Sequence, residues 1–191
     1  MKPKSMGMVS ALITRIAPGT SRPPLHVAPA PTALDAEGCR QLMSNWATGV
    51  SVVTCEGRDG PRGCTVNSLT SLSLDPLLLL VALHGRSSTL DAIRVTRRFC
   101  VNMLAADQEP LSHRFARPAA DMAKFAGVDY TLVDGLPVLG GCLATIRCEA
   151  EQVYSGGDHE IVVARPIAGQ TADDAAPLIF FRRGYGNQVA A

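Results

Sequence analysis

The chain has 191 residues, which is enough for one domain with a full hydrophobic core and too short for two. Apolar residues make up 47% of it and charged residues 18%, which excludes an acidic or polybasic disordered protein. Because 18 Lys and Arg balance 17 Asp and Glu, nucleic acid is not expected as the principal partner. The longest apolar run, residues 77–83, is far below the ~20 residues of a membrane span, so we expect no membrane insertion.

The cysteines and histidines are dispersed along the chain. The six cysteines form no C-x-x-C motif, and no histidine stands near them at ligand spacing. Buried, reduced thiols and the absence of a metal site are therefore the expectation.

The first 34 residues are predicted to be a disordered tail, since they carry four basic residues, six prolines and no acidic residue. A weak apolar patch at residues 6–13 is followed at once by Arg15 and by no convincing cleavage site, which argues against a signal peptide. A basic transit segment stays open as an alternative. We expect a cytoplasmic protein with a short second tail at residues 188–191.

Residues 36–47 predict the first helix, because Cys39, Leu42, Met43 and Trp46 recur at a spacing of three and four and form one apolar face. Asp35 precedes this helix as a possible cap, and Gly49 would end it. Strands at residues 50–55 and 62–68, joined by a turn rich in Gly and Pro, then predict a hairpin.

The most informative stretch is residues 63–89. A predicted strand from Thr65 to Ser73 alternates short polar side chains with Val and Leu, and such donors can lie against a planar ligand. After Asp75-Pro76, the apolar run 77–83 predicts a strand that is buried on both faces. The run ends before Gly85–Thr89 and a predicted helix at residues 88–96, whose free N–H groups would favour a phosphate. In the alternative interpretation, the polar strand faces water and Ser87–Thr89 only cap the helix.

The remaining segments add strands and few helices. Asn102, in a strand at residues 98–104, would either bond backbone groups or touch a ligand. Six or seven strands with two or three helices favour an antiparallel barrel, and no Rossmann or P-loop motif is present. The other predicted elements are a helix at residues 107–116, a less regular segment at residues 124–137, a long strand at 142–154, a turn at 155–158, a strand at 161–164 and a last strand at 178–181.

Several short motifs, in their order and spacing, resemble the flavin reductase-like proteins, especially the reductase components of two-component flavin monooxygenases. The resemblance spans roughly residues 37–187 and implies a mainly β fold, an antiparallel Greek-key split β-barrel with a few short helices, in a domain at residues 35–187. It also implies a homodimer whose protomers share the pocket. The motifs are residues 47–54, 63–76, 86–89, 99–104, Phe115, 124–125, 157–161 and 177–181.

The same resemblance implies site residues. Thr65, Val66, Asn67 and Ser68 would line the isoalloxazine, with Ser71 nearby, and Trp46, Thr48 and Gly49 would shape the pocket. Ser88 and Thr89, with Arg86 behind them, would hold the flavin phosphate. Asn102 and Phe125 would border the flavin, Tyr185 would close the cofactor end, and His159 would face the nicotinamide as the candidate catalytic residue. A structural role in the Gly-Gly turn is the alternative for His159.

The implied reaction is hydride transfer from NADH or NADPH to FMN or FAD, after which the reduced flavin diffuses to a separate flavin-dependent oxygenase. Because the cofactors carry this chemistry, the protein must supply positioning and electrostatics rather than an acid–base pair. An oxidoreductase with tightly bound flavin, a non-catalytic flavin-binding protein and a barrel without flavin affinity remain the alternatives.

Overall fold

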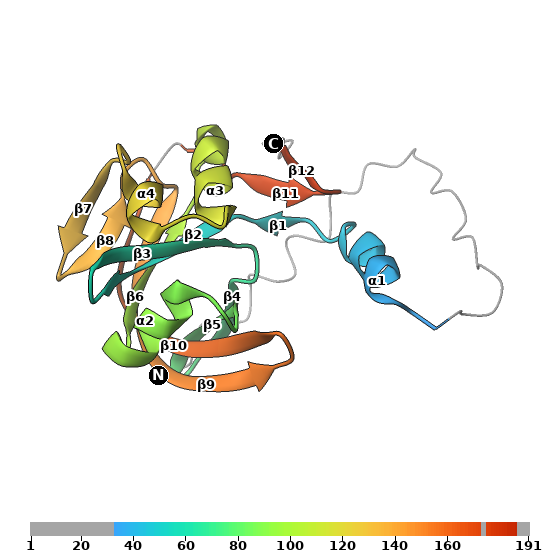
Figure 1. Cartoon of the computed structure of the whole chain (residues 1–191), viewed down its shortest axis with the longest axis horizontal. Coiled ribbons are helices and arrows are strands. Elements are labelled where there is room, and N and C mark those ends of the chain that lie inside the picture. Colours follow the sequence, from blue (N-terminus) through green and yellow to red (C-terminus); the bar gives the residue numbers. More distant parts are fainter. Residues whose placement is uncertain (1–32, 173–174, 187–191) are drawn as a thin grey trace, which may run out of the picture. The chain divides into compact units, whose positions relative to one another are not determined.

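A seven-stranded antiparallel sheet forms the centre of the protein in the computed structural model, which describes residues 33–172 and 175–186 (Figure 1). The strand order is β3-β2-β6-β9-β10-β5-β4. The mainly β, antiparallel fold that the sequence predicts is confirmed. The strands of this sheet are β2 (Ser51–Gly57), β3 (Gly60–Val66), β4 (Thr70–Leu74), β5 (Leu77–His84), β6 (Arg98–Met103), β9 (Ala144–Gly156) and β10 (His159–Thr171).

The two edge strands of this sheet, β3 and β4, are consecutive in the chain. Only Asn67, Ser68 and Leu69 join them, and four Cα–Cα steps reach at most about 14 Å, so the sheet must curl until its edges approach each other. The Ser68 hydroxyl fixes this connection to β5, because it donates to Ala82 O over 2.9 Å and accepts from Ala82 N over 3.0 Å. The sheet is therefore barrel-like and open between β3 and β4.

Two smaller sheets complete the β structure of the described residues. A three-stranded sheet contains β1 (Thr48–Gly49), β11 (Ile179–Phe181) and β12 (Gly184–Gly186), and a hairpin contains β7 (Tyr130–Val133) and β8 (Leu136–Leu139).

Short helices lie on both faces of the sheet at β3. Helices α2 (Ser88–Thr96), α3 (Glu109–Ala116) and α4 (Asp121–Phe125) all contact β3 (Figure 1). Helix α2 packs in one buried cluster, and α3 and α4 pack in another. Leu90 and Ile93 of α2 are fully buried, and Arg97 ends that helix in the left-handed region at φ 58°. The other helices are α1 (Ala36–Met43) and the 3-10 turn η1 (Ala106–Gln108).

Several predicted elements are confirmed, and α2 and the β2–β3 hairpin lie close to their expected bounds. Strand β5 occupies the apolar run, but its burial alternates: Leu79, Val81 and Leu83 are buried, whereas Leu78 and Leu80 on the other face are only half-buried. The prediction of a strand that is buried on both faces is therefore wrong in the single chain.

Other predicted bounds need correction. Helix α1 ends at Met43 instead of residue 47, and none of its residues is buried. Gly49, which was predicted to end the helix, belongs to strand β1. The predicted strand from Thr65 to Ser73 breaks into β3 and β4 because residues 67–69 make the connection between the sheet edges. The segment predicted as irregular, residues 124–137, contains the end of α4, β7 and the start of β8.

The elements from Glu37 onward form one compact unit. The predicted tails lie outside the described residues, apart from residues 33 and 34. Among residues 33–172 and 175–186, no helix combines the length and the apolar character needed to cross a membrane.

Candidate active site

A cavity of about 430 Å³ lies where β3, the end of β5, the start of α2 and the end of α3 meet; we call it the cationic cavity. Arg86, Arg117 and Lys124 line it, and no Asp or Glu does among the residues that the structure describes. Three cations without a carboxylate create a positive potential that favours an anionic ligand. The cavity also contains the predicted residues Thr65, Val66, Asn67, Ser68 and His159.

One wall of the cationic cavity is the end of β3. The Thr65 hydroxyl donates to Ser112 O over 2.7 Å, and the Ser68 hydroxyl is already bonded to Ala82. These side chains hold the wall in place, while Asn67 between them is exposed. The wall therefore offers the Asn67 amide as its most accessible polar side chain.

Two histidines stand side by side at the end of the β5–β10 pair. His84 and His159 are cross-strand partners, and their rings meet edge-on with centroids 5.4 Å apart. His84 Nδ1 accepts the Arg86 backbone N–H over 3.1 Å, so its other ring nitrogen, Nε2, carries the proton in the neutral form. His84 also lines the cavity, although the sequence analysis did not select it; its position at the end of an apolar run and just before Gly85-Arg86 was the available signal.

The His159 ring is held by its chain neighbour. Nδ1 of His159 lies 2.8 Å from Oδ1 of Asp158, and this hydrogen bond lowers the pKa of the Asp158 carboxyl below its ordinary value. Asp158 therefore fixes the orientation of a ring that borders the cavity.

Trp46, Thr48 and Gly49 line a separate depression, which we call the Trp46 groove. It comprises two adjoining cavities of about 330 Å³ and about 540 Å³. Asn67 lines both of them as well as the cationic cavity, so it connects the two regions. Trp46 is 69% exposed, and Thr48 Oγ1 is buried without a hydrogen-bond partner among the described residues.

The residues predicted to hold the flavin phosphate are Arg86, Ser88 and Thr89, and of these Arg86 lines the cationic cavity. Ser88 is exposed and donates to Asp121 Oδ2 over 2.8 Å, and the Thr89 side chain is fully buried in the core, so neither lines the cationic cavity. Ser87 lines it instead, beside Arg86, and makes no side-chain capping bond at the start of α2. Of the three hydroxyl side chains at residues 87–89, Ser87 is thus the one that faces the cationic cavity.

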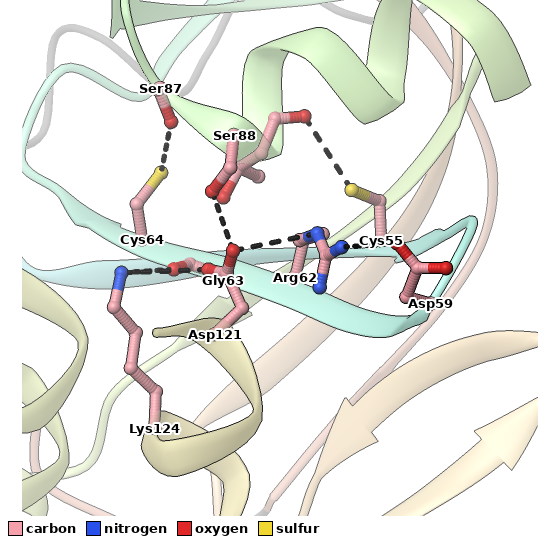
Figure 2. A network of polar contacts seen from close by, with 10 residues as sticks. Cys55, Asp59, Arg62, Gly63, Cys64, Ser87, Ser88, Asp121 and Lys124 are labelled. Carbon is pink, nitrogen blue, oxygen red and sulfur yellow. Dashed lines mark hydrogen bonds and ion pairs between the residues drawn. The ribbon is translucent and has the colours of Figure 1, made fainter. Parts of the chain in front are cut away.

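A network of polar contacts supports the cationic end of the cavity (Figure 2). Lys124 Nζ donates to Gly63 O over 3.2 Å, and Asp121 lies between Lys124 and Arg62. Because Gly63 has no side chain, the Phe115 ring can pack directly against the β3 backbone; a Cβ on Gly63 would stand 2.9 Å from that ring. Lys124 was not among the predicted site residues.

Four further predicted site residues also lie away from the cationic cavity. Asn102 is fully buried; it donates to Val52 O and to Thr54 Oγ1, each over 3.0 Å, and accepts from Leu139 N over 2.9 Å, which supports the backbone-bonding alternative. Phe125 packs edge-on against Phe115 in the core, and Ser71 is exposed on β4. Tyr185 donates to or accepts from Ser112 Oγ over 2.8 Å, behind the Thr65 wall.

All six cysteines are free thiols. Burial raises the pKa of Cys55, Cys100 and Cys148 to about 12, and it also raises the pKa of Cys64, which lines the cationic cavity. The expectation of buried thiols holds except for Cys39, which is exposed, and Cys64, which is half-buried.

Several solved structures with a similar fold are named flavin reductases. An NADH:FAD oxidoreductase of Streptomyces globisporus, in complex with NAD and FAD fragments, superposes with a TM-score of 0.77 at 30% identity, covering 82% of this chain and 94% of that one. The flavin reductase like domain model matches residues 43–188. The chain therefore belongs to the flavin reductase-like family.

Two relatives show how this family is represented in other proteins. The reductase component of a 4-nitrophenol 4-monooxygenase/4-nitrocatechol 2-monooxygenase from Rhodococcus opacus is 36% identical over 156 residues, which are 82% of this chain and 83% of the relative. A probable flavin reductase from Rhizobium meliloti is 40% identical over 136 residues, or 70% of this chain. The chain covers 43% of the length of that second relative.

Proposed function

We propose that this protein is an NAD(P)H:flavin oxidoreductase that reduces FMN or FAD and releases the reduced flavin to a separate flavin-dependent oxygenase. The observation that carries the proposal, beside the family, is the cationic cavity, in which three cations and no carboxylate stand next to a wall of short polar residues. A flavin nucleotide needs such a pair of surfaces, one for its phosphate and one for its planar ring.

The two ends of the flavin then have different sites. Arg86, Ser87, Arg117 and Lys124 bind the phosphate at the cationic end. Residues 65–68 contact the ring system, and Asn67 directs it towards the Trp46 groove, where Trp46, Thr48 and Gly49 lie. The flavin supplies the electron chemistry, and the protein orients it.

His159 is the proposed nicotinamide-facing residue, with His84 beside it. Neither ring has to remove a proton for hydride transfer, so the proposed role of His159 is to position the nicotinamide by hydrogen bonding or ring contact. His159→Ala should raise the KM for the nicotinamide nucleotide at least several-fold more than the KM for flavin. Steady-state kinetics with each substrate varied in turn measures this, and equal changes in both KM values would indicate a structural role.

The protein is proposed to act as a homodimer. Leu72, Leu74 and Leu77, on β4 and at the start of β5, are 47%, 83% and 47% exposed, beside the Trp46 groove to which Thr70 of β4 contributes. A second copy covering this face would bury these leucines and bring Ser71 of β4 into an enclosed site. The monooxygenase relative supports an oxygenase as the acceptor of reduced flavin.

Oxidation of NADH and of NADPH by the purified protein, with and without added FMN, FAD or riboflavin, tests the proposal. Turnover that requires added flavin is the expected result, and the rates identify the preferred pair of substrates. Turnover with a flavin that copurifies in equal amount would indicate the tightly bound alternative. Flavin binding without oxidation of either nucleotide would indicate a non-catalytic flavin-binding protein and contradict the proposal.

A further inference from the structure

Helix α4 places a lysine in the wall of the cationic cavity. Lys124 is only 9% exposed, yet it lines this cavity and a neighbouring one of about 760 Å³ that follows α3. Its ammonium group has three N–H donors, and Gly63 O accepts one of them over 3.2 Å. Donor capacity therefore remains for a ligand in the cavity.

A largely buried carboxylate also lies beside this ammonium group, close enough for an ion pair but not for a hydrogen bond. Oδ1 of Asp121 is 3.7 Å from Lys124 Nζ, while Oδ2 is 3.4 Å from Arg62 Nε and accepts from Ser88 Oγ over 2.8 Å. Figure 2 shows the carboxylate between residues of β3, α2 and α4. Its side chain is 11% exposed, so water screens these interactions only weakly.

Without this carboxylate, two cations would be left near each other. Arg62 and Lys124 would repel each other, and the Lys124 side chain would regain rotamers that ligand binding must then restrict. Ser88 would also lose the acceptor that ties the start of α2 to α4.

We infer that Asp121 is a positioning residue, which holds Lys124 and the start of α2 in place so that Lys124 binds the flavin phosphate. This inference rests on the proposed function, because it assigns one group of the flavin to one side chain. Asp121 itself does not line the cavity and touches no ligand in this assignment.

The sign of the effect separates positioning from simple electrostatics. By Coulomb's law alone, removing a negative charge next to a phosphate site should tighten phosphate binding. Loss of positioning should weaken it, because the cation then has to be ordered when the ligand binds. The two explanations thus predict opposite changes for the same substitution.

Asp121→Asn tests the inference, since the amide keeps the shape of the side chain and an oxygen acceptor for Ser88. We expect the Kd for FMN to rise about fivefold to tenfold, which is the size of the cost of ordering one long side chain on binding, and the Kd for riboflavin, which has no phosphate, to change by less than about twofold. Quenching of flavin fluorescence measures both constants.

Asp59→Asn is the matched control. Asp59 lies 3.8 Å from the same Arg62, on its other side, and its side chain is 79% exposed. The substitution removes the same charge without releasing Lys124, so both Kd values should stay within about twofold of the wild type.

Lys124→Gln completes the test. It should weaken FMN binding at least as much as Asp121→Asn does, again without affecting riboflavin, and the double variant should lose no more than Lys124→Gln alone. If Asp121→Asn does not fold, a selective loss of FMN binding in Lys124→Gln still supports the phosphate contact. Asp121→Ser then takes the place of Asp121→Asn as the test of positioning.

Three results would overturn the inference. They are tighter FMN binding in Asp121→Asn, equal losses for FMN and riboflavin in that variant, or unchanged FMN binding in Lys124→Gln. A wild-type protein that reduces flavins but binds FMN and riboflavin equally would refute the phosphate contact as well. Failure of the wild type to bind any flavin would instead refute the proposed function itself.

Discussion

The two sides of the β3–β4 connection differ in how far their apolar side chains are buried within one chain. On the β3 side, Gly63, Phe115 and Phe125 pack without space between them, and Lys124 and Asp121 are paired. On the β4 side, leucines of the same size as those of the core are exposed. Burial of a strand residue here thus depends on what covers the strand and not on the residue type alone.

Phe115→Ala should give the largest effect and would test whether the β3 side is as well packed as the contacts indicate. Phe115 is 1% exposed and meets Phe125 edge-on at 4.9 Å between ring centroids. We expect a loss of about 3–5 kcal/mol in the free energy of unfolding, measured by urea titration. Leu132→Ala, at a position that is 61% exposed, should change it by less than about 0.5 kcal/mol. If Phe115→Ala lowered the free energy of unfolding only slightly, the β3 side would not be better packed than the β4 side.

Two glycine substitutions test whether the backbone is closely packed at β3 and has open space in the Trp46 groove. A Cβ on Gly63 would stand 2.9 Å from Phe115 Cε1, whereas a Cβ on Gly49, in the Trp46 groove, would meet nothing within 4 Å. Gly63→Ala should therefore destabilise the protein by about 1–3 kcal/mol, and Gly49→Ala should leave the stability within about 0.5 kcal/mol. Thermal unfolding of both variants is the measurement, and equal losses would contradict the comparison.

Leu74→Lys combined with Leu77→Lys tests whether a second copy covers the β4 side. Both side chains are exposed in the single chain, so the fold should tolerate the charges, with a change in protomer stability below about 1 kcal/mol. Analytical ultracentrifugation should show a dimer for the wild type and monomers for the double variant. The control is Val95→Lys, at an 83% exposed position on α2, which should remain dimeric. A dimeric Leu74→Lys, Leu77→Lys variant would place the interface elsewhere.

A further prediction, which concerns the core and not the two sides of the connection, is a pH dependence of stability from the buried thiols. Their pKa is about 12 in the folded protein for Cys55, Cys100 and Cys148, against an ordinary value of 9.0, so the folded state binds more protons than the unfolded chain above that value. The stability contributed by these groups is fully present below pH 9 and falls as the pH rises towards 12. Urea titrations at increasing pH should show this decline. Cys55→Ala should reduce the slope, and Cys39→Ala, at an exposed position, should not.

The parts that the sequence predicted well are those governed by local patterns. Helix α2 follows from apolar periodicity, strand β5 follows from its unbroken apolar run, and the β2–β3 hairpin follows from its turn residues. The cationic cavity was predicted in its β3 wall and at Arg86 and His159.

The parts that were missed depend on contacts between distant segments. One residue advances a helix by about 100°, so a pattern that places a hydroxyl at the start of α2 cannot choose between Ser87 and Ser88. Lys124 lies on a helix of five residues, which is too short for a periodic signal, and its partner Gly63 is 61 positions away. Trp46 was predicted on a helix face, but the chain has already left α1 at Met43.

The three-residue connection between β3 and β4 also has a consequence for local opening. Because Asn67, Ser68 and Leu69 join the two edges of the open sheet, a ligand bound on them contacts both edges at once. Separation of the edges then requires the ligand to leave, so ligand binding should raise the free energy of that local opening. Amide hydrogens at the ends of β3 and β4 should consequently exchange more slowly when flavin is bound, although these strands lie at opposite ends of the sheet order.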